Sequence, residues 1–131
     1  MARRRSSFGF LGRFGRSQDL RRLDEALRAV DLHPALVPEG VKLALVNLLK
    51  DRLGDDPPLE AYAPAAALFA YCALGAGAFA QANGDAAMED ASDRLDRAIA
   101  GDGLDADIVL LAHHAKMIQR DIVAHHGVEV G

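Results

Sequence analysis

Four of the five histidines fall in the last predicted helix, which spans residues 104–126, and imidazole is the side chain best suited to acid–base chemistry near neutral pH. At 100° per residue, His114, Asp121 and His125 lie within about 40° of one another beside the apolar stripe of that helix. His114 and His125 are roughly 16 Å apart along the axis, which is too far for one metal ion. We therefore expect a hydrogen-bonded His–Asp pair at the rim of a helix interface. A metal site would need further ligands from another helix or subunit.

His113 lies on a different face of the same predicted helix, together with Lys116 and Arg120. The segment Ala112-His113-His114-Ala115-Lys116 resembles the Ala-His-x-Leu-Lys-Gly core of histidine phosphotransfer domains, which are small helical bundles. The resemblance implies that His113 carries the phosphoryl group and that Lys116 supplies the cation that holds it. The glycine of the motif corresponds to Met117 in this chain.

The N-terminal segment has a composition of its own. Residues 1–22 carry seven arginines and one acidic residue, a net charge of +6, whereas the remaining 109 residues carry eight basic and eighteen acidic side chains, a net charge of −10. Residues 1–16 form a predicted basic tail, docked or flexible, whose candidate interaction residues are Phe8, Phe10, Phe14, Arg13 and Arg16. Three phenylalanines gain nothing from exposure to water, so we expect the tail to meet a partner. The open possibilities are the domain itself, a second subunit, single-stranded nucleic acid, or an anionic membrane touched by Phe10, Leu11 and Phe14.

Several classes of chemistry are excluded or disfavoured by composition. The single cysteine, Cys72, excludes an internal disulfide and any multi-thiolate zinc site, and its position in the most apolar segment predicts inert packing. The sequence has no phosphate-binding loop, no His-Glu-x-x-His and no Cys-x-x-Cys motif. We expect no cofactor and no metal. An uninterrupted apolar signal segment is missing, so the cytoplasm is the default compartment.

Apolar spacing predicts an all-α fold. Helices are expected from Ser17 to about residue 30, over 38–53, from Pro64 to about residue 80, over 85–100 and over 104–126. Residues 61–80 carry no charge and could span a bilayer in length, but half of them are alanine, so we expect a central core helix. The predicted architecture is a compact bundle of about five helices around this alanine-rich helix. Residues 17–131 form a single domain, preceded by the tail.

These features favour a small non-enzymatic protein–protein interaction module that self-associates as a homo-oligomer through an apolar helix face or the tail. Two alternatives stay open. One is a phosphotransfer-like signalling protein that uses His113, and the other is tail-directed binding to an anionic membrane or nucleic acid.

Overall fold

The structure, a computed structural model, describes residues 7–128, with side chains from residue 18 onward. Within that range it is entirely helical, which confirms the predicted all-α class, but it contains seven α-helices where five were predicted. They are α1 (Ser7–Ala29), α2 (Glu39–Leu53), α3 (Leu59–Leu74), α4 (Ala76–Asn83), α5 (Asp85–Ala100), α6 (Leu104–His114) and α7 (Arg120–His126), with the short 3-10 helix η1 (Pro34–Leu36) between α1 and α2.

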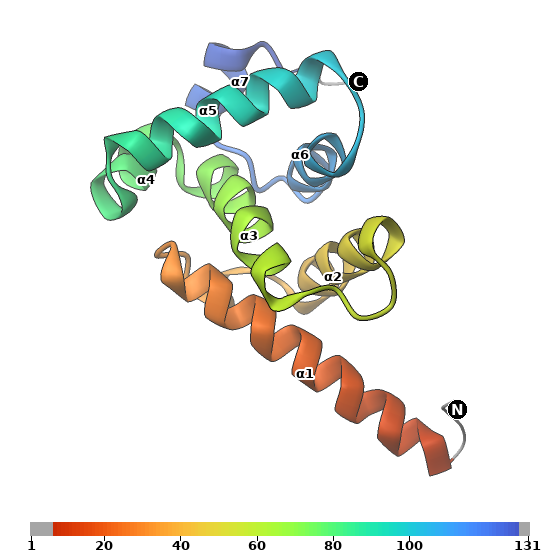
Figure 1. Cartoon of the computed structure of the whole chain (residues 1–131). Coiled ribbons are helices and arrows are strands. Elements are labelled where there is room, and N and C mark those ends of the chain that lie inside the picture. The colour runs from red at the N-terminus through yellow and green to blue at the C-terminus, as the bar shows by residue number, and fades with distance from the viewer. Residues whose placement is uncertain (1–6, 129–131) are drawn as a thin grey trace.

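The alanine-rich helix α3 lies at the centre of the fold. It packs against α1, α4, α5 and α6, and Figure 1 shows it running between α1 on one side and α5 on the other. Half of its sixteen residues are buried, and they are Tyr62, Ala65, Ala66, Leu68, Phe69, Ala70, Tyr71 and Cys72. The alanines allow neighbouring helices to approach closely, while the larger side chains fill the remaining space.

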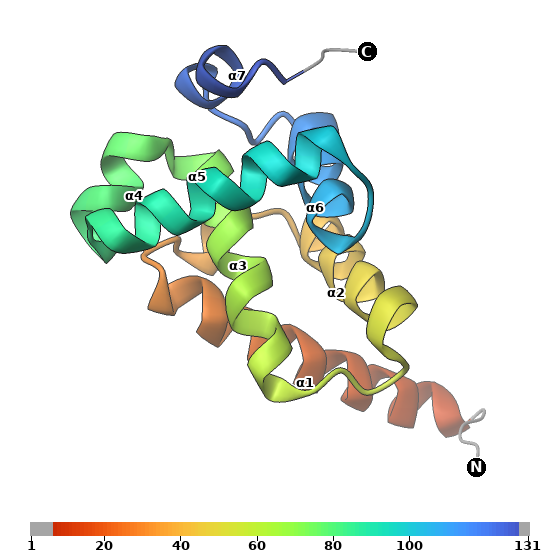
Figure 2. The same ribbon diagram turned by 45° about the horizontal axis from the view of Figure 1, so that its top comes forward.

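Helix α1 includes residues that were predicted to form a separate tail. Leu23 and Leu27 form the buried stripe that was expected, but the helix begins at Ser7 and not at Ser17. Residues 7–16 are therefore the first turns of α1, and Figures 1 and 2 show this part of the helix extending past α2 and α3. Because the helix is continuous, these residues cannot fold back onto their own domain.

Helix α3 begins five residues before Pro64, the predicted start, and Pro64 lies inside it. An internal proline removes one backbone hydrogen bond, which is why the sequence favoured a later start. The earlier start buries Tyr62, whose ring is only 1% exposed. The burial of this aromatic side chain offsets the cost of the proline.

The helix predicted from Pro64 to about residue 80 is divided at Gly75, whose φ of +92° separates α3 from α4. The carboxylate of Asp121 accepts a hydrogen bond of 3.1 Å from the backbone N–H of Ala76, in the first turn of α4. The break thus allows a distant acidic side chain to satisfy a free N–H at the start of α4.

The predicted helix over residues 104–126 is divided as well. Helix α6 ends at His114, Lys116 adopts a φ of +59°, and α7 begins at Arg120. Gln119, in the connection, donates from its backbone N–H to the carbonyl of Cys72 and from its side-chain amide to the carbonyl of Ala73, both at 2.9 Å. The break therefore satisfies carbonyls at the C-terminal end of α3 that have no partner within the helix.

Candidate functional site

An apolar groove of about 210 Å³ lies between the end of α5 and helix α6. Ala98 and Ile99 of α5 line it together with Val109 and Leu110 of α6, and Val128, which follows α7, completes the lining. Leu110 is 56% exposed and Ile99 is 39% exposed. The groove therefore leaves aliphatic surface in contact with water, and covering that surface would be favourable.

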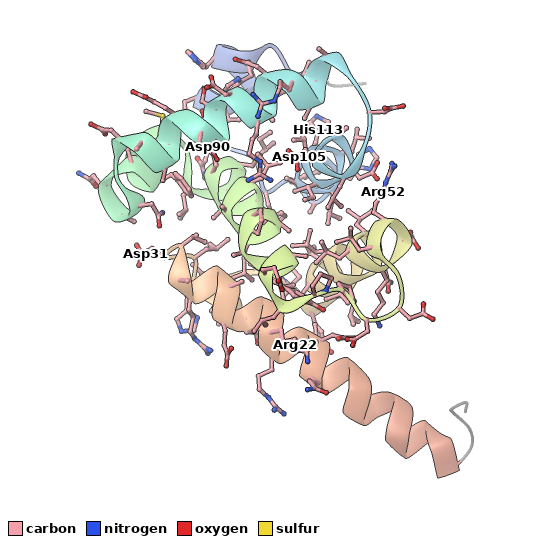
Figure 3. The ribbon with its side chains drawn as sticks, in the orientation of Figure 1. Arg22, Asp31, Arg52, Asp90, Asp105 and His113 are labelled. Atoms are coloured by element: carbon pink, nitrogen blue, oxygen red, sulfur yellow. The ribbon has the colours of Figure 1, made fainter. Side chains whose placement is uncertain are left out.

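The segment that contains α5 and the start of α6 is rich in acidic residues. Residues 85–107, which include α5 and the start of α6, carry eight acidic and two basic side chains, a net charge of −6. One of the two basic residues, Arg94, donates to both carboxylate oxygens of Asp105 at 3.1 and 3.0 Å and to the carbonyl of Pro64 at 3.0 Å. Figure 3 shows Asp90 on α5 and Asp105 on α6. Apart from Arg97, which is exposed, the free charges of this segment are negative.

A buried hydrogen-bond relay holds α7 against the rest of the fold. The side chain of His126 has no exposed surface. Its Nδ1 lies 2.7 Å from the Asp96 carboxylate on α5, and its Nε2 lies 2.8 Å from the hydroxyl of Tyr71 on α3. A carboxylate only accepts, so Nδ1–H donates to Asp96, and in the neutral ring Nε2 accepts from the Tyr71 hydroxyl.

The relay is suited to positioning rather than to catalysis. Burial raises the pKa of Tyr71, which keeps the phenol protonated and able to donate to His126. Both imidazole nitrogens are engaged and the ring is covered, so no substrate atom can reach it. Directly after His126, Gly127 ends α7 with a φ of +66°, and the N–H of Val128 donates to the carbonyl of Val123 at 3.2 Å. The relay thus fixes the segment that brings Val128 to the groove.

The predicted rim residues form no hydrogen bond in this relay, although the ring of His125 packs edge to face against that of His126 with their centroids 4.7 Å apart. His114 and His125 are exposed, and the carboxylate of Asp121 accepts from the N–H of Ala76. No hydrogen bond joins Asp121 to His125 in the described part of the chain. The His–Asp pair that forms is instead His126 with Asp96, which sequence reasoning missed because Asp96 lies thirty residues away on α5 and helical spacing does not identify such a partner.

The phosphotransfer resemblance placed His113 and Lys116 on one helix, which the structure does not do. His113 is half-buried in the last turn of α6, its ring 6.0 Å from that of His114 in an edge-to-face arrangement. Lys116 is exposed, beyond the end of the helix and in the left-handed region. The helical spacing that would place the Lys116 cation beside the His113 ring is therefore absent.

Two further predictions concern cysteine and metal. Cys72 is fully buried, and burial raises the pKa of its thiol to about 12, so the reactive thiolate is disfavoured. Across residues 18–128, no group of three histidine, cysteine or acidic side chains comes together to hold a metal ion.

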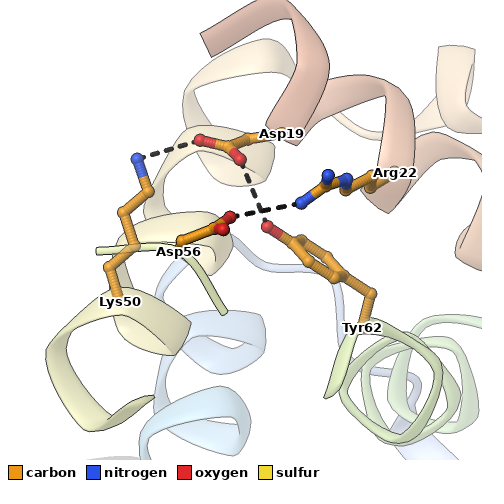
Figure 4. Close-up of polar contacts among 5 residues, drawn as sticks. All are labelled: Asp19, Arg22, Lys50, Asp56 and Tyr62. Atoms are coloured by element: carbon orange, nitrogen blue, oxygen red, sulfur yellow. Dashed lines mark hydrogen bonds and ion pairs between the residues drawn. The ribbon is translucent and has the colours of Figure 1, made fainter. Parts of the chain in front are cut away.

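A second polar cluster joins α1, α2 and α3 at the base of the N-terminal turns (Figure 4). The carboxylate of Asp19 accepts from Lys50 at 2.9 Å and from the hydroxyl of Tyr62 at 3.4 Å, while Arg22 lies 3.4 Å from Asp56. Burial and the neighbouring Asp19 raise the pKa of Tyr62. These charges pair with one another across the helices, so the cluster fastens α1 to the domain, and a cavity of about 300 Å³ lies beside it with Asp19, Asn47 and Lys50 in its lining.

The predicted interaction residues of the tail, Phe8, Phe10, Phe14, Arg13 and Arg16, lie in the helical backbone of α1, but their side chains are outside the described ones. None of the helices within residues 7–128 combines the length and apolar character that crossing a membrane requires. Comparisons with protein-family models, curated proteins and solved structures found no match.

Proposed function

We propose that this chain is a non-enzymatic protein–protein interaction module that self-associates through the groove between α5 and α6. The observation that carries the proposal is the exposure of Ile99 and Leu110 at the rim of a groove that also includes Val128. Aliphatic side chains gathered around a hollow are typical of a surface that another protein covers.

The groove is better suited to a protein side chain than to a small molecule. Its volume of about 210 Å³ is below the roughly 300–1,000 Å³ of common ligand pockets. Its lining side chains are aliphatic, so it lacks the polar groups that orient a substrate or cofactor. A large apolar side chain from another protein surface needs no such groups.

The proposal predicts that the full chain associates with increasing concentration and that Leu110→Lys weakens this association at least about tenfold, because a charge enters the apolar contact. Sedimentation velocity over a concentration series measures the dissociation constant. Leu36→Lys is the matched control, since Leu36 is 66% exposed on η1 and lies outside the groove. A wild-type chain that stays monomeric throughout, or a Leu110→Lys chain that associates like wild type, would contradict the proposal.

A further inference from the structure

The first turns of α1, residues 7–16, form a projecting segment that we call the arm. They are continuous with the part of the helix that packs against α3, and at 1.5 Å per residue they extend about 15 Å. Figures 1 and 2 both place the start of α1 at the other end of the molecule from α5. The arm therefore does not reach its own groove.

The helical period divides the arm into two faces. Positions 13 and 16, both arginine, continue the side of α1 that carries Leu23 and Leu27. Positions 10, 11 and 14, which are Phe, Leu and Phe, have a mean direction about 140° from that of the two arginine positions, and position 10 is the nearest of them, about 60° from position 13. The arm thus has the pattern of an amphipathic helix with one apolar and one basic face.

The arm and the groove are complementary in apolar character and in charge. The groove offers aliphatic surface, and residues 97–107, which adjoin it in the sequence, carry three acidic side chains and one basic side chain, a net charge of −2. The arm carries Arg13 and Arg16 and no acidic residue, a net charge of +2, and it contains the apolar positions named above. An amphipathic helix commonly binds by laying its apolar face into a hydrophobic groove, with opposite charges setting its orientation.

We propose that the arm of one copy binds the α5–α6 groove of a second copy. This inference rests on the proposed self-association and names the two surfaces that meet. Because the arm and the groove are different surfaces of the same chain, the contact is head-to-tail, and repetition gives a ring or a growing chain of subunits. A second copy is favoured over a membrane or nucleic acid because the chain itself carries an acidic, apolar surface that matches the arm.

The test combines two full-length variants that are defective in different halves of the contact. The arm variant carries Arg13→Glu and Arg16→Glu, and the groove variant carries Leu110→Lys. Each variant alone is expected to associate at least about tenfold more weakly than wild type. Their equimolar mixture is expected to form a dimer that does not grow, because it contains one intact arm and one intact groove. Added salt is expected to weaken wild-type association by screening the charges.

Arg21→Glu with Arg28→Glu is the control for the arm variant, because it makes the same charge change at exposed positions of α1 outside the arm. This control is expected to associate like wild type. A second arm variant, Phe10→Ser with Phe14→Ser, tests the apolar face without changing charge, and circular dichroism checks the helicity of every chain.

Four outcomes separate the explanations. Wild-type association of both arm variants, with loss in the groove variant, would overturn the arm and leave the proposed function standing. If the equimolar mixture stays monomeric, one intact arm and one intact groove are not sufficient for association. That result would indicate a symmetric contact and overturn the head-to-tail arrangement. A wild-type chain that is monomeric at every concentration would overturn both proposals. A monomeric chain that binds phosphatidylserine vesicles or a single-stranded oligonucleotide through the arm would assign the arm to that partner instead.

Discussion

The imidazole of His126 makes two hydrogen bonds inside the fold, one to Asp96 at 2.7 Å and one to Tyr71 at 2.8 Å. Asp96 lies on α5 and Tyr71 on α3, so one side chain on the seven-residue helix α7 connects it to two longer helices. A helix this short is not stable by itself, and tertiary contacts must hold it in place. At the scale of single residues, His126 is therefore expected to matter for stability.

We expect His126→Ala to lower the free energy of unfolding by about 2–4 kcal/mol, because it removes the hydrogen bonds to Asp96 and to the Tyr71 hydroxyl and creates a cavity. The exposed His114 provides the control, since it lies outside the relay and His114→Ala should change stability by less than about 0.5 kcal/mol. Urea denaturation followed by circular dichroism measures both values. Equal effects of the two substitutions would show that the relay has no special role.

The thiol of Cys72 predicts how stability changes in alkaline solution. Its pKa is raised by burial from 9.0 to about 12, so above pH 9 the unfolded chain loses a proton that the folded chain retains. Unfolding is then favoured, and stability falls as the pH rises from about 9 towards 12. The raised pKa values of Tyr62 and Tyr71 act in the same direction.

Cys72→Ala is expected to reduce this alkaline loss of stability, because the variant keeps both tyrosines but has no thiol to titrate. Denaturation curves measured at several pH values above 9 compare the slopes of the two chains. Parallel slopes for wild type and variant would show that the thiol titrates equally in the folded and unfolded states.

At the scale of helices, the division between α3 and α4 depends on Gly75. Its φ of +92° is rarely adopted by other residues, and an added Cβ would lie 3.0 Å from a carboxylate oxygen of Asp121. We expect Gly75→Ala to destabilise the fold by about 1–3 kcal/mol through backbone strain and crowding.

Gly77→Ala is the matched comparison, because Gly77 lies in α4 with open space around its Cβ position. It should stabilise the fold by up to about 1 kcal/mol, since alanine is the better helix former. Thermal unfolding monitored by circular dichroism ranks the three chains. A Gly75→Ala chain at least as stable as wild type would contradict this prediction, and it would show that the chain can form its helix break at another residue.

Local signals in the sequence predict the existence of helices better than their divisions. The stripe of Leu23 and Leu27 and the bounds of α2 follow from spacing and from proline and glycine positions. The breaks depend on contacts between distant residues, such as Gln119 with the carbonyls of Cys72 and Ala73. Periodicity carries no information about such partners, so the breaks were missed.

The candidate site was less predictable than the helices. Ile99 and Leu110 each read as part of an amphipathic helix, and only the packing of α5 beside α6 shows that both remain exposed at one groove. The histidine-rich segment was recognised, but its faces were assigned on an unbroken helix. That assignment selected His125 with Asp121 and missed His126, whose partners come from α3 and α5.

At the scale of the whole molecule, opposite charges occupy separate regions of one chain. Residues 1–22 carry +6 and residues 85–107 carry −6, although the chain as a whole has a net charge of only −4. Attraction between segments of opposite charge orients approaching copies before they touch.

The continuity of α1 has a further geometric effect. A flexible tether would allow bound copies to swivel freely, whereas a helix that continues into the packed interior transmits its direction to the rest of the subunit. Each link would then repeat nearly the same rotation and translation, and that screw operation sets the pitch of a regular superhelix or the number of subunits that close a circle.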